Sequence, residues 1–90
     1  MRNSAHQVIV LYFAKSAELT GVRAEPIVLP TPISSQELWQ QLLQQHPRLH
    51  LLDNQVVLAV RQQYIAIGDQ VSVELQEGDE VAVLPPLSGG

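Results

Sequence analysis

The sequence contains no cysteine and few basic residues. Without cysteine it can form neither disulfides nor thiolate metal sites, so any sulfur that it carries must be held elsewhere. Only five of its 90 residues are lysine or arginine, they are scattered, and the net charge is -4, so we expect no nucleic-acid partner. No apolar run approaches the roughly 18 residues of a membrane helix, and residues 1–7 lack a signal-peptide pattern. We therefore expect a cytoplasmic protein without a membrane partner.

The order of predicted elements indicates the fold class. A chain of this length has room for one hydrophobic core, and no repeat or linker divides it. Residues 1–90 are therefore predicted to form a single domain, with 85–90 as a flexible tail. One good helix among several short strands predicts an α+β fold, in which one main helix packs on one face of a mixed sheet.

Strands are predicted where β-branched and aromatic residues gather or alternate with polar ones. The segments are 7–13, 23–29, 54–61, 64–67, 71–75 and 80–84. The first is apolar on both faces, which predicts a central strand covered on two sides. Pro26 confines the second to an edge. Turns are predicted at Pro30 and Pro32, at Gln62-Gln63 and at 77–79.

Two helices are predicted. Residues 14–20 form a short one that Gly21 ends, because glycine suits the left-handed position after a helix. The main helix begins at a capping box of Ser34 and Glu37 and ends near Pro47. Its apolar residues recur at helical spacing and are interpreted as core: Leu38, Trp39, Leu42 and Leu43.

One main helix leaves the other face of the sheet uncovered, although the strands carry apolar residues there. We predict that Phe13, Tyr64 and Leu84 belong to a partner-binding patch on this face, because contiguous exposed apolar area usually marks an interface. The alternative is that loops and the short helix cover these side chains.

The C-terminal segment carries the chemistry. Pro85 and Pro86 stiffen its exit from the sheet, and Gly89-Gly90 can pass through a slot too narrow for any side chain. The reactive group is predicted to be the Gly90 carboxylate, activated as an adenylate. The sequence has no phosphate-binding glycine loop, so an activating enzyme must supply the nucleotide site. A sulfur nucleophile then displaces AMP and leaves a thiocarboxylate.

Four segments carry a family resemblance: 11–15 (LYFAK), 59–62 (AVRQ), 78–83 (GDEVAV) and 85–90 (PPLSGG). With them the chain resembles the small subunits of molybdopterin synthase, the MoaD-type sulfur carriers of the MoaD/ThiS family. The resemblance covers nearly the whole chain and implies a ubiquitin-like β-grasp fold. Arg61 is a departure, since many bacterial members have asparagine there, but no sulfur chemistry depends on it.

The resemblance also implies a reaction cycle. An adenylyltransferase and sulfurtransferase related to ubiquitin-activating enzymes converts Gly90 to glycyl adenylate and then to 1-thioglycine, with no bound cofactor. The tail, including Leu87 and Ser88, enters a pocket of the large subunit, where its sulfur passes to cyclic pyranopterin monophosphate and forms the dithiolene. The chain is then a cosubstrate, not catalytic alone, in a heterotetramer of two small and two large subunits. Phe13, Tyr64 and Leu84 match the partner-facing positions.

Two histidines and a group of acidic residues are also candidates for function, but structural roles explain them. His46 and His50 have a spacing that two metal ligands could use, but Pro47 interrupts the helix, so we expect no metal. Acidic residues gather around the last turn and are interpreted as a solvated turn, or as a surface that docks on a basic rim: Glu74, Glu77, Asp79 and Glu80.

Two other functions stay open. The first is a carrier for thiamine thiazole synthesis or tRNA thiolation, since those relatives also end in Gly-Gly. The second is a non-covalent β-grasp interaction module in which the glycine tail is incidental.

Overall fold

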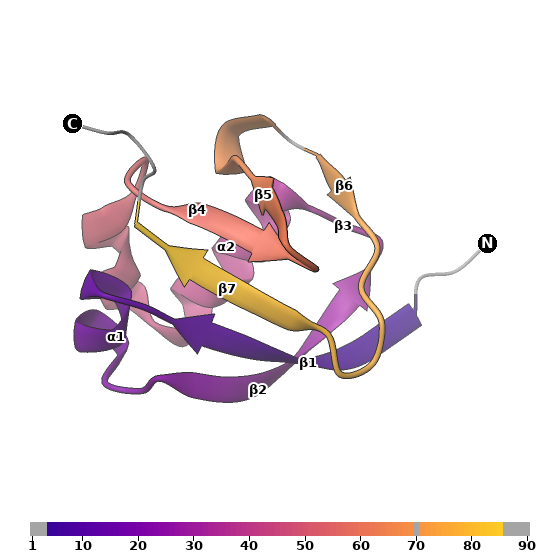
Figure 1. Ribbon diagram of the computed structural model, residues 1–90, viewed down its shortest axis with the longest axis horizontal. Coiled ribbons are helices and arrows are strands. Elements are labelled where there is room, and N and C mark those ends of the chain that lie inside the picture. Colours follow the sequence, from indigo (N-terminus) through magenta and orange to yellow (C-terminus); the bar gives the residue numbers. More distant parts are fainter. Residues whose placement is uncertain (1–3, 70, 86–90) are drawn as a thin grey trace.

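The computed structural model describes residues 4–69 and 71–85, which form a main sheet of five strands and a small sheet of two. The main sheet has the strand order β2-β1-β7-β4-β5 (Figure 1). β1 and β7 are parallel and the other neighbouring pairs antiparallel, so the sheet is mixed, as predicted. Its strands are β1 (Ser4–Tyr12), β2 (Ala24–Thr31), β4 (Val57–Val60), β5 (Gln63–Ile65) and β7 (Glu80–Leu84). The small sheet pairs β3 (Ile33–Ser34) with β6 (Ser72–Val73).

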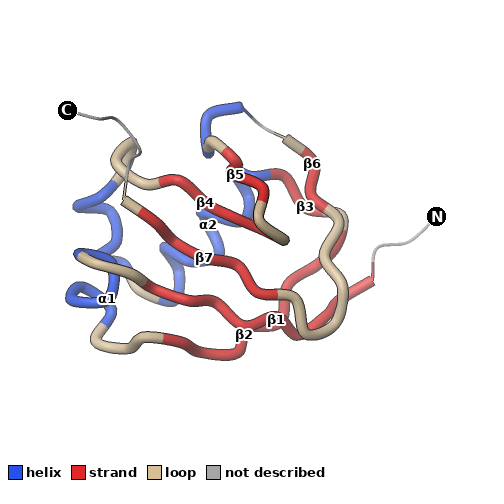
Figure 2. Tube along the Cα trace, viewed as in Figure 1, coloured by secondary structure: helices blue, strands red, loops and turns tan. Residues whose placement is uncertain are grey.

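One main helix, α2 (Ser35–Gln45), packs on one face of the main sheet. It lies behind the sheet in Figure 1, and Figure 2 shows the same layers coloured by element type. A short helix, α1 (Lys15–Thr20), and a 3-10 helix, η1 (Pro47–Leu52), contact each other at one end of the sheet, and a 3-10 turn, η2, spans Ile67–Asp69. No helix in the described ranges is long and apolar enough to cross a membrane.

The hydrophobic core fills the space between the sheet and α2. Every second residue of the two parallel strands points inward, so Val8, Val10, Val81 and Val83 are fully buried. The helix contributes the predicted apolar stripe, which is confirmed as core: Leu38, Trp39, Leu42 and Leu43. Each such buried aliphatic side chain stabilises the fold by about 1.5–3 kcal/mol relative to exposure.

The capping box of α2 is confirmed. The Glu37 N–H donates to Ser34 Oγ at 3.0 Å, and the Ser34 N–H donates to Glu37 Oε1 at 3.1 Å. Each bond satisfies a backbone donor that the first turn leaves unpaired.

Replacing Ser34 with alanine should lower the free energy of unfolding by about 1 kcal/mol, because the Glu37 N–H loses its acceptor. Urea unfolding at neutral pH measures the change. Gln44→Ala, at an exposed position of the same helix, is the control and should change stability by less than about 0.5 kcal/mol. A Ser34→Ala variant as stable as the wild type would contradict this contribution of the cap.

Several local predictions are confirmed. β1 has a neighbouring strand on each side, and β2 is an edge strand that contains Pro26. Gly21 follows α1 with φ of 78° and its N–H donates to the Ala17 carbonyl at 2.9 Å. The predicted cover on both faces of β1 is wrong in part, because Ile9 and Leu11 on its second face are only half-buried.

Most strand boundaries differ from the prediction by one to three residues: β1 begins at Ser4, β5 ends at Ile65 and β6 covers only Ser72–Val73. Three differences have a clear physical reason. Pro30 lies within β2, opposite Ala5, so the turn comes at Pro32 instead. The third strand begins at Val57 because Asn54 adopts φ of 67° and the chain is still turning there. Val60 pairs with Gln63, so the hairpin turn is Arg61-Gln62 and not Gln62-Gln63. Both turn residues have positive φ, as a two-residue hairpin that matches the strand twist requires.

Candidate functional site

The side of the main sheet away from α2, here called the outer face, carries a continuous set of apolar side chains. The strand register places Leu11 beside Ala82, Ala82 beside Ala59, and Ala59 beside Tyr64, so one apolar row crosses four strands. Val57 and Leu84 form the start of the next row. The outer face comprises Ile9, Leu11, Phe13, Val57, Ala59, Tyr64, Ala82 and Leu84, all half-buried or exposed. Figure 1 looks onto this face.

The predicted patch residues lie on the outer face. Phe13 is 45% exposed and Tyr64 is 63% exposed, whereas Leu84 is half-buried at the end of β7. Phe13 and Leu84 are close, since the Phe13 N–H donates to the Val83 carbonyl at 3.3 Å. Tyr64 lies on β5, at the edge of the sheet and three strands away from β1, which Phe13 follows. The loops and α1 therefore leave Phe13 and Tyr64 largely open, against the alternative that they are covered.

A shallow hollow of about 500 Å³ lies in the outer face. It opens over Ala59 and Ala82, because methyl side chains leave room that larger residues would fill, and Leu11 forms one wall. Charged groups of Arg61 and Asp79 stand on its rim. The face can thus take a partner's side chain at its centre while its edge remains polar, which is the usual anatomy of a protein interface.

The outer face ends where the C-terminal segment begins. Leu84 and Pro85 line a small, mostly apolar cavity of about 170 Å³ together with Phe13 and Lys15. Pro85 itself is exposed, at the end of β7. The other predicted tail residues lie outside the described residues: Pro86, Leu87, Ser88, Gly89 and Gly90. What the structure places is the root of the tail, directly beside the apolar face.

Two of the four acidic residues of the last turn, Glu77 and Asp79, form side-chain hydrogen bonds within the chain. Asp79 accepts hydrogen bonds from Arg61 and from the Gln76 N–H, and Arg61 also donates to the Glu74 carbonyl at 2.7 Å. Glu77 accepts from the Gln7 N–H at 3.0 Å. Asp79 and Glu77 thus hold the turn against the sheet, and Arg61 has a structural role that the sequence did not reveal.

The two histidines point to different carboxylates. His46 caps the C-terminal end of α2 and contacts Glu25, whereas His50 contacts Asp53 at 3.0 Å. Across residues 4–69 and 71–85, no three histidine, cysteine or acidic side chains come together as a metal site.

Tyr12, Glu25 and His46 form a hydrogen-bonded cluster on the helix side of the sheet. The Tyr12 hydroxyl donates to Glu25 Oε2 at 2.6 Å, and His46 Nε2 lies 2.5 Å from the same oxygen. The two rings meet edge to face with centroids 5.5 Å apart. Burial, then the hydrogen bond and the negative charge of Glu25, raise the pKa of Tyr12 well above its ordinary value. The cluster ties the end of α2 to β1 and β2.

Replacing Tyr12 with phenylalanine should change how stability depends on alkaline pH. Because the folded-state pKa of Tyr12 is raised above its ordinary value of 10.0, only the unfolded chain releases this proton near that pH. The stabilisation is fully present below pH about 10 and is lost as the pH rises. Urea unfolding over an alkaline pH series should show a smaller fall in Tyr12→Phe than in the wild type. Equal slopes would contradict the raised pKa.

Sequence reasoning missed much of the outer face. Ala59 and Ala82, which make its central hollow, carry no chemical signal by themselves. Their alternation with the buried residues Leu58, Val60 and Val81 is the signal that could have identified them, because neighbouring residues in a strand point to opposite faces.

The comparisons with known proteins identify the family. The ThiS family matches residues 10–90 of this sequence. The chain belongs to the ThiS family. The human molybdopterin synthase sulfur carrier subunit is 56% identical over 84 residues, which cover 93% of this chain and 94% of that one. The Chlamydomonas reinhardtii protein of the same name is 40% identical over 84 residues, or 93% of this chain and 99% of that one.

Solved structures agree on the fold. A Pyrococcus furiosus chain assigned as subunit 1 of a molybdopterin converting factor superposes with a TM-score of 0.73 at 30% identity, covering 91% of this ThiS-family chain and 99% of that one. A chain in the complex of subunits 1 and 2 of the molybdopterin-converting factor from Helicobacter pylori gives 0.59 at 24% identity, covering 93% and 99%. Small archaeal modifier protein 1 from Methanosarcina acetivorans gives 0.73 at 20% identity, covering 97% and 99%. The predicted ubiquitin-like β-grasp fold is confirmed.

Proposed function

We propose that this chain is the sulfur carrier subunit of molybdopterin synthase. The observation that carries the proposal is the 56% identity to the human subunit of that name, which extends over 93% of this chain. A match of this extent leaves no large part of the chain for an unrelated activity. The outer face supplies the second support, because a carrier that hands over its cargo must dock before its tail can react.

The large subunit of the synthase is the proposed partner of the outer face. The Helicobacter pylori structure is a complex of subunits 1 and 2, and the present chain shares the fold of one chain of that complex. Docking on the row from Leu11 to Tyr64 desolvates apolar surface without unpairing any backbone group, since the strands beneath are already paired. A partner seated there lies beside Leu84 and Pro85, where the tail begins.

The proposed cargo is one sulfur atom on the Gly90 carboxyl group. A carboxylate oxygen attacks the α-phosphorus of ATP, pyrophosphate leaves, and the product is glycyl adenylate. A hydrosulfide-level nucleophile (HS⁻) then attacks the carbonyl carbon, AMP leaves, and loss of the proton from sulfur gives the thiocarboxylate of 1-thioglycine. A sequence without cysteine has no thiol that could compete for the activated carbonyl or for the sulfur.

Other proteins carry out the catalysis in this proposal. An adenylyltransferase related to ubiquitin-activating enzymes supplies the nucleotide site, and the large subunit supplies the pocket in which the sulfur passes to cyclic pyranopterin monophosphate. The chain is a cosubstrate with no bound cofactor of its own. Its cytoplasmic location stays a prediction.

Reconstitution tests the proposal in two steps. Incubation with the activating enzyme, ATP and a sulfur source should increase the intact mass by one oxygen-to-sulfur exchange. Addition of the large subunit and cyclic pyranopterin monophosphate should then produce the dithiolene. A thiocarboxylate that forms but serves only thiazole synthesis or tRNA thiolation would place the carrier in another pathway, and an unchanged mass would favour the non-covalent module.

A further inference from the structure

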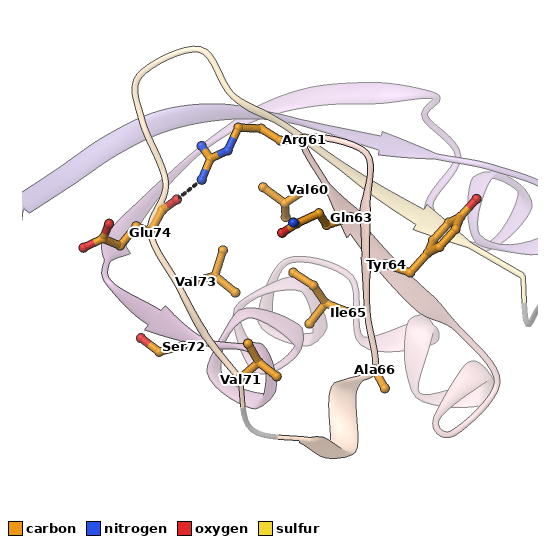
Figure 3. A pocket seen from close by; sticks show the side chains of 10 residues that line it. All are labelled: Val60, Arg61, Gln63, Tyr64, Ile65, Ala66, Val71, Ser72, Val73 and Glu74. Atoms are coloured by element: carbon orange, nitrogen blue, oxygen red, sulfur yellow. Dashed lines mark hydrogen bonds between the residues drawn. The ribbon is translucent and has the colours of Figure 1, made fainter.

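A groove of about 830 Å³ separates the main sheet from the small sheet. One wall is β5 with the residues around it, and the other is the segment that contains β6, as Figure 3 shows. Ile65 and Val73 are buried and form the apolar floor, and Val71 is 44% exposed. Arg61 reaches across one end and donates to the Glu74 carbonyl at 2.7 Å. This bond bridges the two walls at one end, and η2, in the connection from β5 to β6, lies at the other end. The groove opens between these two ends.

The walls of the groove are strand edges with free backbone groups. In the β4–β5 hairpin, Val60 and Gln63 flank a two-residue turn and form a hydrogen-bonded pair. Hydrogen-bonded and non-hydrogen-bonded pairs alternate along an antiparallel ladder. The next pair, Ala59 with Tyr64, is therefore non-hydrogen-bonded, and the Tyr64 N–H and C=O point away from β4 toward the groove.

The opposite wall, formed by β6, also turns unpaired backbone groups toward the groove. The Ser35 N–H donates to the Val71 carbonyl at 2.8 Å, so Val71 faces β3, and the alternation turns the N–H and C=O of Ser72 toward the groove. The bond from Arg61 to the carbonyl of Glu74, two residues further on, confirms this direction. Two unpaired strand edges thus face each other across an apolar floor.

The other edge of the main sheet is closed to strand addition. Tyr12 donates to the Arg23 carbonyl at 2.9 Å, so by alternation the backbone nitrogens of Ala24, Pro26, Val28 and Pro30 point to the free side of β2. Two of these four positions are prolines without an N–H, a common protection of edge strands. β5 contains no proline. In the part of the chain that the structure describes, the main sheet therefore has one blocked edge and one receptive edge.

We propose that the β5–β6 groove binds an extended segment of the partner that docks on the outer face, by strand addition to β5. The inference rests on the proposed function, in which that partner is the large subunit. Tyr64 links the groove to the outer face, because its side chain belongs to the outer face while its backbone lines the groove.

The volume and the lining of the groove predict the length and the side chains of the segment that it binds. A strand residue occupies about 160 Å³, from a rise of about 3.3 Å, a strand spacing of about 4.8 Å and a layer of about 10 Å. The groove volume of about 830 Å³ therefore matches roughly five residues. Side chains that point to the floor should be apolar, because Ile65 and Val73 offer only hydrocarbon there. Backbone pairing would supply affinity, and the floor would select the alternate side chains.

Amide hydrogen exchange of the wild-type carrier tests the inference without a mutation. The Tyr64 and Ser72 amides should exchange rapidly in the free carrier and at least about tenfold more slowly in the complex with the large subunit, because a new acceptor protects them. Complex formation with no slowing at either amide would overturn strand addition and leave the proposed function intact. Slowing in concentrated carrier alone would identify a second copy as the occupant and overturn the assignment to the large subunit.

A matched pair of variants separates backbone pairing from side-chain contact. Ser72→Pro removes the N–H that faces the groove, and Ser72→Ala keeps it while removing the hydroxyl. We expect Ser72→Pro to weaken binding of the large subunit about tenfold and Ser72→Ala to change it less than twofold. Equal affinities of the two variants would overturn the inference. If Ser72→Pro does not fold, the exchange measurement on the wild type decides. A wild-type complex in which both amides are protected but no sulfur is transferred would count only against the proposed function.

Discussion

Adding one alanine after Gly90 should abolish thiocarboxylate formation and leave the thermal unfolding midpoint unchanged. The addition moves the reactive carboxyl group by one residue and places a methyl group where the proposed slot admits only glycine. A displacement of this size costs at least about 100-fold in rate when reacting groups must be held in place. The folded core is unaffected because β7 ends at Leu84, well before the addition.

Intact-mass analysis after incubation with the activating enzyme, ATP and a sulfur source measures the effect. The control is the same alanine added before Met1, which should leave sulfur loading at the wild-type level. Gly89→Val should reduce sulfur loading as well, because the branched valine side chain is too wide for the proposed slot. An extended carrier that still gains sulfur would contradict the assignment of Gly90 as the reactive group.

Replacing Phe13 with alanine should weaken binding of the large subunit by about 30- to 1,000-fold, which corresponds to about 2–4 kcal/mol for a central interface residue. Phe13 is 45% exposed and lies beside Leu84, at the point where the outer face meets the root of the tail. Because much of the ring already contacts solvent, its removal should change the free energy of unfolding by less than about 1 kcal/mol.

Leu51→Ala is the matched control for this substitution. Leu51 is also a large exposed apolar residue, at 66%, but it belongs to η1 and lies outside the outer face. Its replacement should leave the affinity for the large subunit within about twofold of the wild type. Calorimetric titration gives both dissociation constants. Equal losses in the two variants would show that binding follows general surface hydrophobicity, and no loss in either would remove Phe13 from the interface.

The local elements of the fold could be predicted because their signals are local. Ser34 and Glu37 are three residues apart and begin a helix through their own hydrogen bonds. Gly21 ends α1 and Pro26 marks an edge for reasons contained in single residues. The errors fell where distant contacts decide: Pro30 stays in a strand because its missing N–H faces the free side of β2.

The candidate site could also be predicted only in part from the sequence. The chemistry of the tail follows from the Gly89-Gly90 pair and from the absence of cysteine, both of which can be seen in the sequence. Phe13, Tyr64 and Leu84 were also recognised as candidates from their apolar character. Their place on the face away from the main helix was part of that prediction. The residues that join them into one surface could not be derived from the sequence, because Phe13 and Tyr64 lie on or beside strands that are not neighbours in the sheet.

The sequence by itself determined the element types, the main helix and its cap, and the carboxyl group that is proposed to react. Each depends on residue chemistry or on neighbours within one or two turns of chain. Only the tertiary structure decided which side chains share a face, because the faces follow from strand pairings such as Ile9 with Glu80, far apart along the chain. It alone joined Leu11, Ala82, Ala59 and Tyr64 into one row and turned the backbone of Tyr64 and Ser72 toward one groove, since shifting a strand by one residue would reverse every side chain.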